Sequence, residues 1–378
     1  MAAPRVKKPG PLMRWVDTIH RWTGAIIGVL LAVMGLSGTL LIHEDAWLRA
    51  TVPHAADALV ADTNTYSAVM ERFMSHSPRP INVIFPSESL GVYTLSFGEG
   101  AGAYADQSGA VVTKWDSKWQ RPEVWLFDLH HHLFMGDTGT TVVGVLALIG
   151  LGFVVTGVLV WWRSRREFKL RVLPASLSRL QILRHHRDIG VAAAPLLIVL
   201  FLTGSMLAFR PIADFLFAPW SPMGTITASL APPETRGGAF SNTIKWREMI
   251  AAVRAEYPDA QLRGIGIPRR RDGQLMRVRL KQPEEWLPNG RTIFWLDPAY
   301  GRVIESRDAL VAPAAARAYD MVFPLHASRV GGVIYKIIMT ATGLTLTMLG
   351  SLAVYAFWGY RARRSPRRDH RPAVRTQT

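Results

Sequence analysis

The sequence contains no cysteine and has a low content of charged residues. None of its 378 residues is Cys and 19% are charged, whereas charged residues make up roughly 25% of an ordinary soluble domain. The absence of cysteine excludes disulfide frameworks, thiolate zinc sites, iron–sulfur clusters, a cysteine nucleophile and covalent haem attachment through C-x-x-C-H. Any metal chemistry must therefore rest on the 11 histidines, the carboxylates, methionine or tyrosine.

Motifs for several common activities are also missing. The sequence has no Walker phosphate loop, no G-x-G-x-x-G between a strand and a helix, and no H-E-x-x-H. ATP hydrolysis, an in-chain NAD or flavin domain and zincin proteolysis therefore have no support from the sequence.

The net charge of +16 is concentrated in three short blocks. Residues 1–21, 163–187 and 359–378 contain 20 of the 44 Lys+Arg but only three of the 28 Asp+Glu. Each block adjoins a long apolar run. This distribution is typical of a membrane protein that obeys the positive-inside rule, and not of a nucleic-acid-binding face.

Four apolar runs are long enough to cross a bilayer. About 20 helical residues cross a hydrocarbon core of roughly 30 Å. We therefore expect an α-helical membrane protein with four spans, at residues 22–42, 136–162, 188–209 and 331–358. Lys7 and Lys8 precede the first run as in a signal peptide, but that run is longer than the usual ~7–15-residue signal core.

The basic blocks predict which segments lie on which side of the membrane. The N-terminal segment 1–21, the loop 163–187 and the tail 359–378 are expected to be cytoplasmic. Residues 43–135 and 210–330 would then be periplasmic domains of a multi-pass protein of the bacterial inner membrane.

Each predicted outside segment has the pattern of a small α+β domain. Helices are expected at Tyr66–Met74 and Ile244–Glu256. The strand-like runs are Ile81–Phe85, Val92–Phe97, Gly102–Val112, Leu262–Ile267, Leu275–Lys281 and Thr292–Ile304.

The two halves of the chain contain similar motifs in the same order. The pairs are His20-Arg21-x-x-Gly24 with His186-Arg187-x-x-Gly190, Gly38 with Gly204, Tyr104-x-Asp106-x-x-Gly109 with Trp295-x-Asp297-x-x-x-Gly301, and Phe127-x-Leu129-His130 with Phe323-x-Leu325-His326. We therefore expect two parallel helix–domain–helix repeats, which build a four-helix bundle around a pseudo-two-fold axis along the membrane normal. The Asp and Gly residues of the third pair are expected in β-turns.

His20 and His186 occupy equivalent positions near the starts of the first and third spans. Small residues lie on the same side of each helix as its histidine: Gly24, Gly28, Gly35 and Gly38, and Gly190, Ala194 and Gly204. These stripes would leave room for a flat porphyrin, or would alternatively allow close helix packing. An inward-facing histidine in a membrane is costly without a partner, which favours a ligand role for the pair.

His130 and His326 occupy equivalent positions at the outer ends of the second and fourth spans. His131 and His132 follow His130 directly, and a run of three histidines could also be a solvated loop or an external metal site. Counting along a continuous helix favours His132, whereas the repeat favours His130, which we take as the predicted ligand. His43, at the end of the first span, remains a further candidate without a symmetric partner.

Two symmetric histidine pairs suit two b-type haems with bis-histidine ligation. His20 and His186 would hold an inner haem, and His130 and His326 an outer one. Arg21, Arg187 and Arg329 are candidates for neutralising haem propionates. The residues alone thus predict a transmembrane electron conduit, without a predicted catalytic side chain.

The motifs also carry a resemblance to a known family. The two H-R-x-x-G helix starts, L-H-x-x-L-x-x-G at residues 129–136, T-G-V-L-V-W-W-R at residues 156–163 and the α+β inserts resemble the PepSY-associated transmembrane family over about residues 12–364. The resemblance implies a link to bacterial iron uptake, because some members resemble di-haem reductases of ferric siderophores.

With this resemblance, the predicted function is reduction of a periplasmic ferric siderophore with release of Fe(II). The electron donor would be a quinol or a cytosolic flavoprotein. The alternatives are a non-redox membrane regulator or peptidase-modulating PepSY protein, in which the histidines only stabilise the bundle, and, less favoured, a transporter subunit. No nucleic-acid partner is expected.

Overall fold

A computed structural model describes residues 10–60, 62–241, 243–268 and 273–359. Residues 1–9 and 360–378 of the two predicted cytoplasmic termini lie outside the described residues. The chain divides into two compact units. We call residues 1–36, 149–198 and 341–378 the helical unit, and residues 37–148 and 199–340 the sheet unit.

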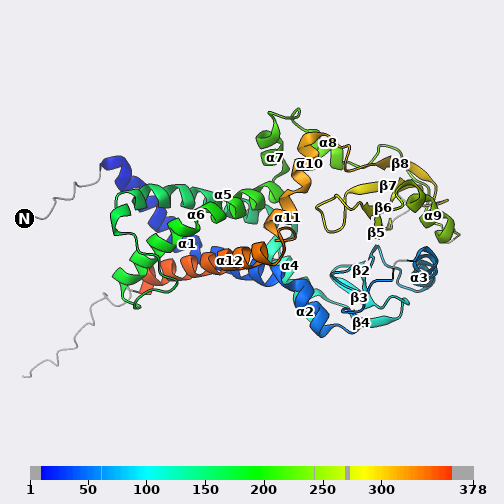
Figure 1. Ribbon diagram of the computed structural model, residues 1–378, viewed down its shortest axis with the longest axis horizontal. Helices are drawn as coiled ribbons and strands as arrows, with labels where there is room; N and C mark the ends of the chain where they lie inside the picture. The colour runs from blue at the N-terminus through cyan, green and yellow to red at the C-terminus, as the bar shows by residue number, and fades with distance from the viewer. Residues whose placement is uncertain (1–9, 61, 242, 269–272, 360–378) are drawn as a thin grey trace, which may run out of the picture. The chain divides into compact units, whose positions relative to one another are not determined.

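Four helices are long and apolar enough to cross a membrane, as predicted. They are α1 (Pro11–Ile42), α5 (Gly136–Trp162), α6 (Arg179–Ala208) and α12 (Gly332–Val354), the last of which continues as the π-helical turn η3 (Tyr355–Gly359) (Figure 1). Helices α1 and α6 begin well before the predicted spans, so His20 and His186 lie inside helices. A short 3₁₀ turn, η2 (Arg165–Glu167), lies between α5 and α6.

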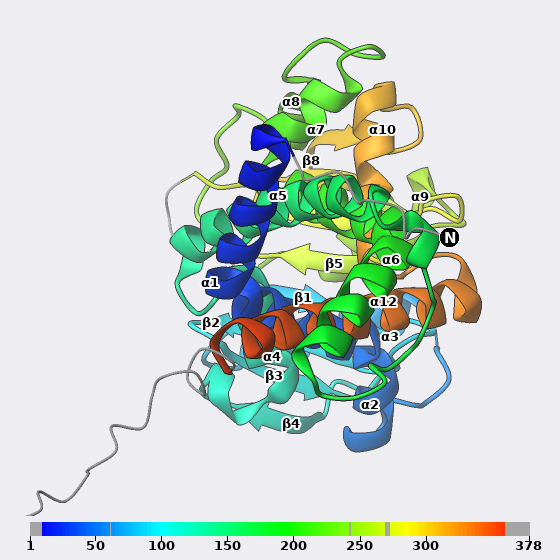
Figure 2. The same cartoon turned by 90° about the vertical axis from the view of Figure 1, so that its left-hand side faces the viewer.

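In the helical unit, glycines allow α1 and α12 to pack closely (Figure 2). A Cβ atom on Gly28 would lie 2.9 Å from the carbonyl oxygen of Gly350, and one on Gly35 would lie 2.7 Å from that of Gly343. Close backbone approach at small residues is a common way for membrane helices to associate. These two glycines of the predicted stripe therefore serve helix packing.

The sheet unit contains one eight-stranded antiparallel sheet with the order β4-β3-β2-β1-β5-β6-β7-β8. Its strands are β1 (Asn82–Ile84), β2 (Tyr93–Gly98), β3 (Ala101–Ala105), β4 (Val111–Trp115), β5 (Gln261–Gly266), β6 (Met276–Lys281), β7 (Thr292–Leu296) and β8 (Val303–Arg307). Two helices, α3 (Thr63–Ser75) and α9 (Trp246–Glu256), pack with the strands in one hydrophobic core.

The sheet corrects the expectation of two separate α+β domains. Strand β1 pairs with β5, so that Val83 lies opposite Ile265, and both side chains are fully buried. Pairing these strands removes two exposed edges with unsatisfied backbone groups. Single-strand patterns contain no information about this long-range pairing, which is why the sequence did not predict it.

The two longest predicted strand runs are hairpins. Residues 102–112 and 292–304 each turn at the predicted Asp…Gly segment. The Asp106 carboxylate accepts hydrogen bonds from the backbone N–H groups of Ser108 and Ala110, at 2.9 and 3.0 Å. Gly109 has a φ of 83° and Gly301 a φ of 69°, in the left-handed region that glycine adopts without strain. The predicted turn role of these residues is confirmed.

Short helices connect the sheet to the long helices. They are α2 (Glu44–Thr51), η1 (Lys118–Gln120), α4 (Pro122–His132), α7 (Arg210–Phe217), α8 (Thr225–Leu230), α10 (Ala314–Asp320) and α11 (Val322–His326). His130 lies on α4 and His326 on α11, and not on the spanning helices themselves. Residues with left-handed backbone conformation separate these two short helices from the spanning helices that follow them. They are Leu133 and Phe134 between α4 and α5, and Ser328 between α11 and α12.

Candidate functional site

The first histidine pair lies in the helical unit. The rings of His20 on α1 and His186 on α6 have centroids 6.3 Å apart and planes at 82°. The Nδ1 atom of His20 is 2.8 Å from the hydroxyl of Thr156 on α5. Phe153, one turn earlier on α5, packs edge-on against the His20 ring at 5.1 Å. Three helices thus fix the position of this pair.

The second pair lies in the sheet unit and has the same spacing. The ring centroids of His130 and His326 are also 6.3 Å apart, with planes at 45°. The Nδ1 atom of His130 is 3.0 Å from the Ser37 hydroxyl, and the Nδ1 atom of His326 is 3.0 Å from the Thr203 hydroxyl. The structure therefore brings together both predicted pairs.

A glycine follows each of these hydroxyl residues and makes room for the imidazole. A Cβ atom on Gly38 would lie 2.8 Å from Cε1 of His130, and one on Gly204 would lie 3.2 Å from Cε1 of His326. Gly157, which follows Thr156, lies beside His20 in the same way, at 3.5 Å. Any side chain at Gly38 would force the His130 ring to move.

The hydroxyl residues were missed by the sequence analysis, although a signal for them exists. Ser37-Gly38 and Thr203-Gly204 are separated by the same 166 residues as His20 and His186, and Thr156-Gly157 is one of several further hydroxyl–glycine dipeptides in the sequence. Gly38 and Gly204 were recognised as equivalent in the sequence, but the hydroxyl residue that precedes each of them was not. His186 differs from the other three, because no described side-chain hydroxyl bonds to its Nδ1 atom, which is buried.

The centroid spacing of both pairs leaves room for one metal atom between two imidazoles. A metal–imidazole bond is about 2.0–2.1 Å long, and the ring centroid lies about 1.1 Å beyond the nitrogen, so two opposed ligands place their centroids about 6.3 Å apart. A hydrogen-bond partner on the second ring nitrogen is the usual support for a ligating histidine. His20, His130 and His326 have such a partner on Nδ1.

The neighbouring histidines have other contacts. The Nδ1 atom of His132 lies 3.2 Å from a carboxylate oxygen of Asp128, and the ring of His131 stacks on Phe127 with centroids 4.1 Å apart. The Nε2 atom of His43 is 2.9 Å from the Thr340 hydroxyl. The helix-face argument for His132 assumed a continuous helix, whereas the left-handed Leu133 ends α4.

Burial keeps the imidazole rings of His326 and its neighbour His131 neutral. It lowers the pKa of His326 to about 4, and lowers the pKa of His131 to about 4 with a further contribution from His326. Both rings are therefore neutral at pH 7, the form in which imidazole binds metals. Among the described residues, no group of three or more His, Asp or Glu side chains converges as a metal site.

The three arginines suggested for propionates already have carboxylate partners. Arg21 contacts Asp17 at 3.4 Å on the exposed side of α1. Arg187 forms ion pairs with Asp188 at 2.7 Å and Glu167 at 3.2 Å. Arg329 contacts Asp45 and lies 3.9 Å from Glu44. Propionate binding by any of them would require these ion pairs to be shared or broken.

Glu44 is a half-buried acid whose charge we expect to destabilise the folded protein. Burial raises its pKa from 4.5 to about 7; Arg329 opposes this shift, whereas Asp45 and Glu123 reinforce it. The folded protein holds this proton at pH values where the unfolded chain has released it, so the contribution to stability declines as the pH rises from about 4.5 through 7.

We predict that Glu44→Gln raises the melting temperature at pH 8 relative to the wild type. The gain corresponds to at most about 3 kcal/mol, and it should shrink as the pH is lowered to 5. Thermal unfolding of the purified protein at both pH values measures the effect. Glu71→Gln, at an exposed position of α3, is the control. A lower melting temperature of Glu44→Gln at pH 8 would show that the contact with Arg329 outweighs the burial of the charge.

The family described as "PepSY-associated TM region" matches residues 18–360, which include all four long helices except the first residues of α1, and the whole sheet. No curated protein matches the sequence.

Proposed function

The chain belongs to the PepSY-associated transmembrane family, and we propose that it is a haem-dependent ferric-siderophore reductase of the bacterial inner membrane. It would accept electrons at the cytoplasmic side, from a quinol or a cytosolic flavoprotein, and pass them to a ferric siderophore in the periplasm. One electron per iron converts Fe(III) to Fe(II), which hard oxygen ligands bind less tightly. The released Fe(II) is the product.

The observation that carries the proposal is the equal spacing of the two histidine pairs. Both have ring centroids 6.3 Å apart, which leaves room for one metal atom held by two imidazoles, and three of the four rings have Nδ1 bonded to a hydroxyl. The same three rings each lie beside a glycine that leaves space for the imidazole. The regulator alternative gives no reason for the matching spacing.

The residues of each pair have distinct roles in this proposal. His20 and His186 would hold an inner haem, and His130 and His326 an outer haem. Thr156, Ser37 and Thr203 would orient the rings through Nδ1, which leaves Nε2 directed to the metal. When bound, b-type haem supplies one-electron redox chemistry that the side chains of this protein lack.

The internal similarity of the chain supports a parallel repeat architecture. His130 contacts Ser37-Gly38 of α1, and His326 contacts Thr203-Gly204 of α6, in matching geometry. We propose two helix–domain–helix repeats with both termini and the 163–187 loop in the cytoplasm. The positive-inside distribution of lysine and arginine supports this orientation.

Cationic side chains on the sheet support an anionic iron chelate as the acceptor. Arg277 and Arg279 lie on the same side of β6 and form no hydrogen bond or ion pair with another described residue. Burial and the neighbouring Arg277 and Arg291 lower the pKa of Arg279 to about 10. A guanidinium that is half-buried beside like charges favours binding of an anion.

The absorption spectrum of the purified protein tests the proposal. We expect a Soret band that sharpens and shifts on reduction, with two haems per chain by pyridine haemochrome assay. Bis-histidine ligation predicts a low-spin spectrum in both oxidation states. A protein that is expressed in haem-replete cells and is colourless when purified would contradict the proposal and favour the non-redox regulator.

A further inference from the structure

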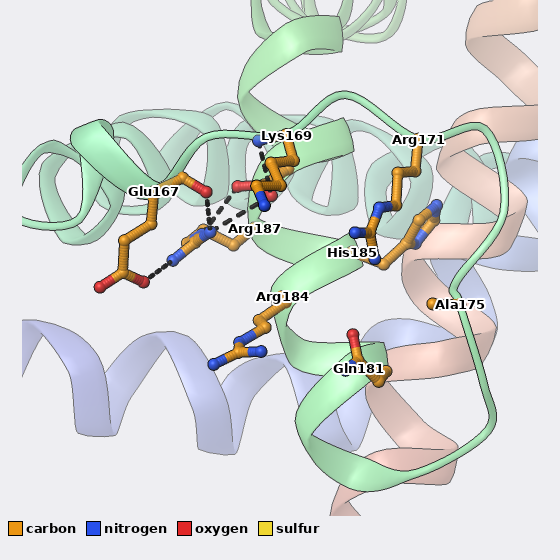
Figure 3. Close-up of a pocket in the computed structure, with 9 residues that line it drawn as sticks. Glu167, Lys169, Arg171, Ala175, Gln181, Arg184, His185 and Arg187 are labelled. Carbon is orange, nitrogen blue, oxygen red and sulfur yellow. Dashed lines mark hydrogen bonds and ion pairs between the residues drawn. The ribbon is translucent and has the colours of Figure 1, made fainter.

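The α5–α6 connection and the start of α6 form a cavity that the proposed function does not use. Its volume is about 290 Å³, close to the lower end of the roughly 300–1,000 Å³ typical of ligand pockets. Figure 3 shows its wall. The lining residues are Glu167, Lys169, Arg171, Ala175, Gln181, Arg184, His185, Arg187 and Asp188. All belong to the helical unit.

One side of the cavity is formed by ion pairs of Arg187 with two carboxylates. Arg187 donates through Nε to Asp188 at 2.7 Å and through Nη1 to Glu167 at 3.2 Å (Figure 3). Asp188 also accepts a hydrogen bond from the backbone N–H of Lys169 at 3.2 Å. Both carboxylates of the cavity are therefore engaged by Arg187, which also fixes the connecting segment against α6.

The remaining cations of the cavity have no such partner. The side chains of Lys169, Arg171 and Arg184 make no hydrogen bond or ion pair with another described residue. Three cationic residues without an ion pair thus line one cavity, and the only two acidic side chains among its described lining residues are already paired with Arg187. This arrangement favours an anionic ligand with several acceptor oxygens.

A buried histidine provides an independent sign of a ligand. His185 is 4% exposed and lines the cavity. Its Nε2 atom is 3.1 Å from the carbonyl oxygen of Val172, which can only accept, so Nε2 carries the hydrogen. The Nδ1 atom is buried and has no hydrogen-bond partner among the described residues. A buried polar atom without a partner is costly and needs an explanation.

We propose that this cavity binds a phosphate group. A phosphate presents several oxygens to Lys169, Arg171 and Arg184, and a hydroxyl of the phosphate or of its substituent can donate a hydrogen bond to Nδ1 of His185. The cavity is larger than a bare phosphate requires, which leaves room for a small substituent such as a glycerol. The phosphate can come from a soluble phosphate compound or from an anionic lipid headgroup.

Calorimetric titration of the purified full-length protein in a non-ionic detergent tests the site. The probes are inorganic phosphate and short-chain phosphatidylglycerol, with short-chain phosphatidylcholine as the headgroup of no net charge. We expect the double variant Lys169→Gln/Arg184→Gln to weaken binding about tenfold or more, because two charge-assisted hydrogen bonds are lost. The control, Arg166→Gln/Arg179→Gln, removes the same charge from exposed positions outside the cavity and should stay within about twofold of the wild type.

The outcomes separate the two sources and can reject the site. Binding of inorganic phosphate with this pattern supports the site and a soluble source, and binding of phosphatidylglycerol alone with this pattern supports the site and a lipid source. Equal weakening in both double variants, or no binding of either probe, would overturn the proposal. Melting temperatures without ligand check that all variants are folded. The readout does not depend on haem, so its failure is distinct from failure of the proposed reductase.

Discussion

Alanine at His326 should remove one of the two haems and leave the other in place. Loss of the His326 imidazole would leave that haem with one histidine, and the buried hydroxyl of Thr203 loses one of its hydrogen-bond partners. His130→Ala should deplete the same haem, because the centroids of the two rings lie 6.3 Å apart. His20→Ala and His186→Ala should each deplete the other one. Haem per chain should fall from two to about one in every case, as measured by pyridine haemochrome assay.

The neighbouring histidines supply matched controls. His132→Ala removes a contact with Asp128, and His43→Ala removes a contact with Thr340, so both variants should keep two haems. Equal spectral losses in His20→Ala and His326→Ala would reject the pairing. Loss of the outer haem in His132→Ala but not in His130→Ala would show that the helix-face count had identified the ligand after all.

Periodicity and composition predicted the local elements of the fold well. Apolar runs predicted the four long helices, and the patterns around Tyr66 and Ile250 predicted α3 and α9. The pairing of β1 with β5 was not predictable from these patterns, because Val83 and Ile265 are far apart in the chain and each reads as an ordinary buried strand residue. Sheet edges are decided by tertiary pairing, which local sequence does not encode.

The candidate site, like the fold, could be predicted only in part from the sequence. The histidine pairs were predicted from the repeat, since equivalent positions in two similar halves suggest equivalent roles. The hydroxyls of Ser37, Thr156 and Thr203 were not, because serine and threonine are common in apolar helices, where they often bond their own backbone. Only the contact with a histidine on another element distinguishes them. Counting along a helix could not decide among residues 130–132, because α4 ends at His132 and the count assumed that the helix continues.

Electron transfer across a membrane is the result on which the proposed function depends. We expect vesicles containing the oriented protein, with reductant trapped on the cytoplasmic side, to reduce an impermeant ferric chelate outside. The proposal places one histidine pair near each face, since a single carrier near one face would leave most of a roughly 30 Å hydrocarbon layer uncrossed. A ferrous-specific dye outside the vesicles measures the rate.

Variants identify the route of the electrons. His20→Ala and His326→Ala should each reduce the rate to the leak of protein-free vesicles, because each removes one step of the relay. His132→Ala vesicles, prepared in the same way, should keep the wild-type rate, because His132 pairs with Asp128 and not with the histidine pair. If His20→Ala lacked the inner haem yet transferred electrons at the wild-type rate, a relay through His20 and His186 would be rejected. A quinol would then deliver electrons directly at the pair formed by His130 and His326, and the first pair would serve only to hold α1 against α6.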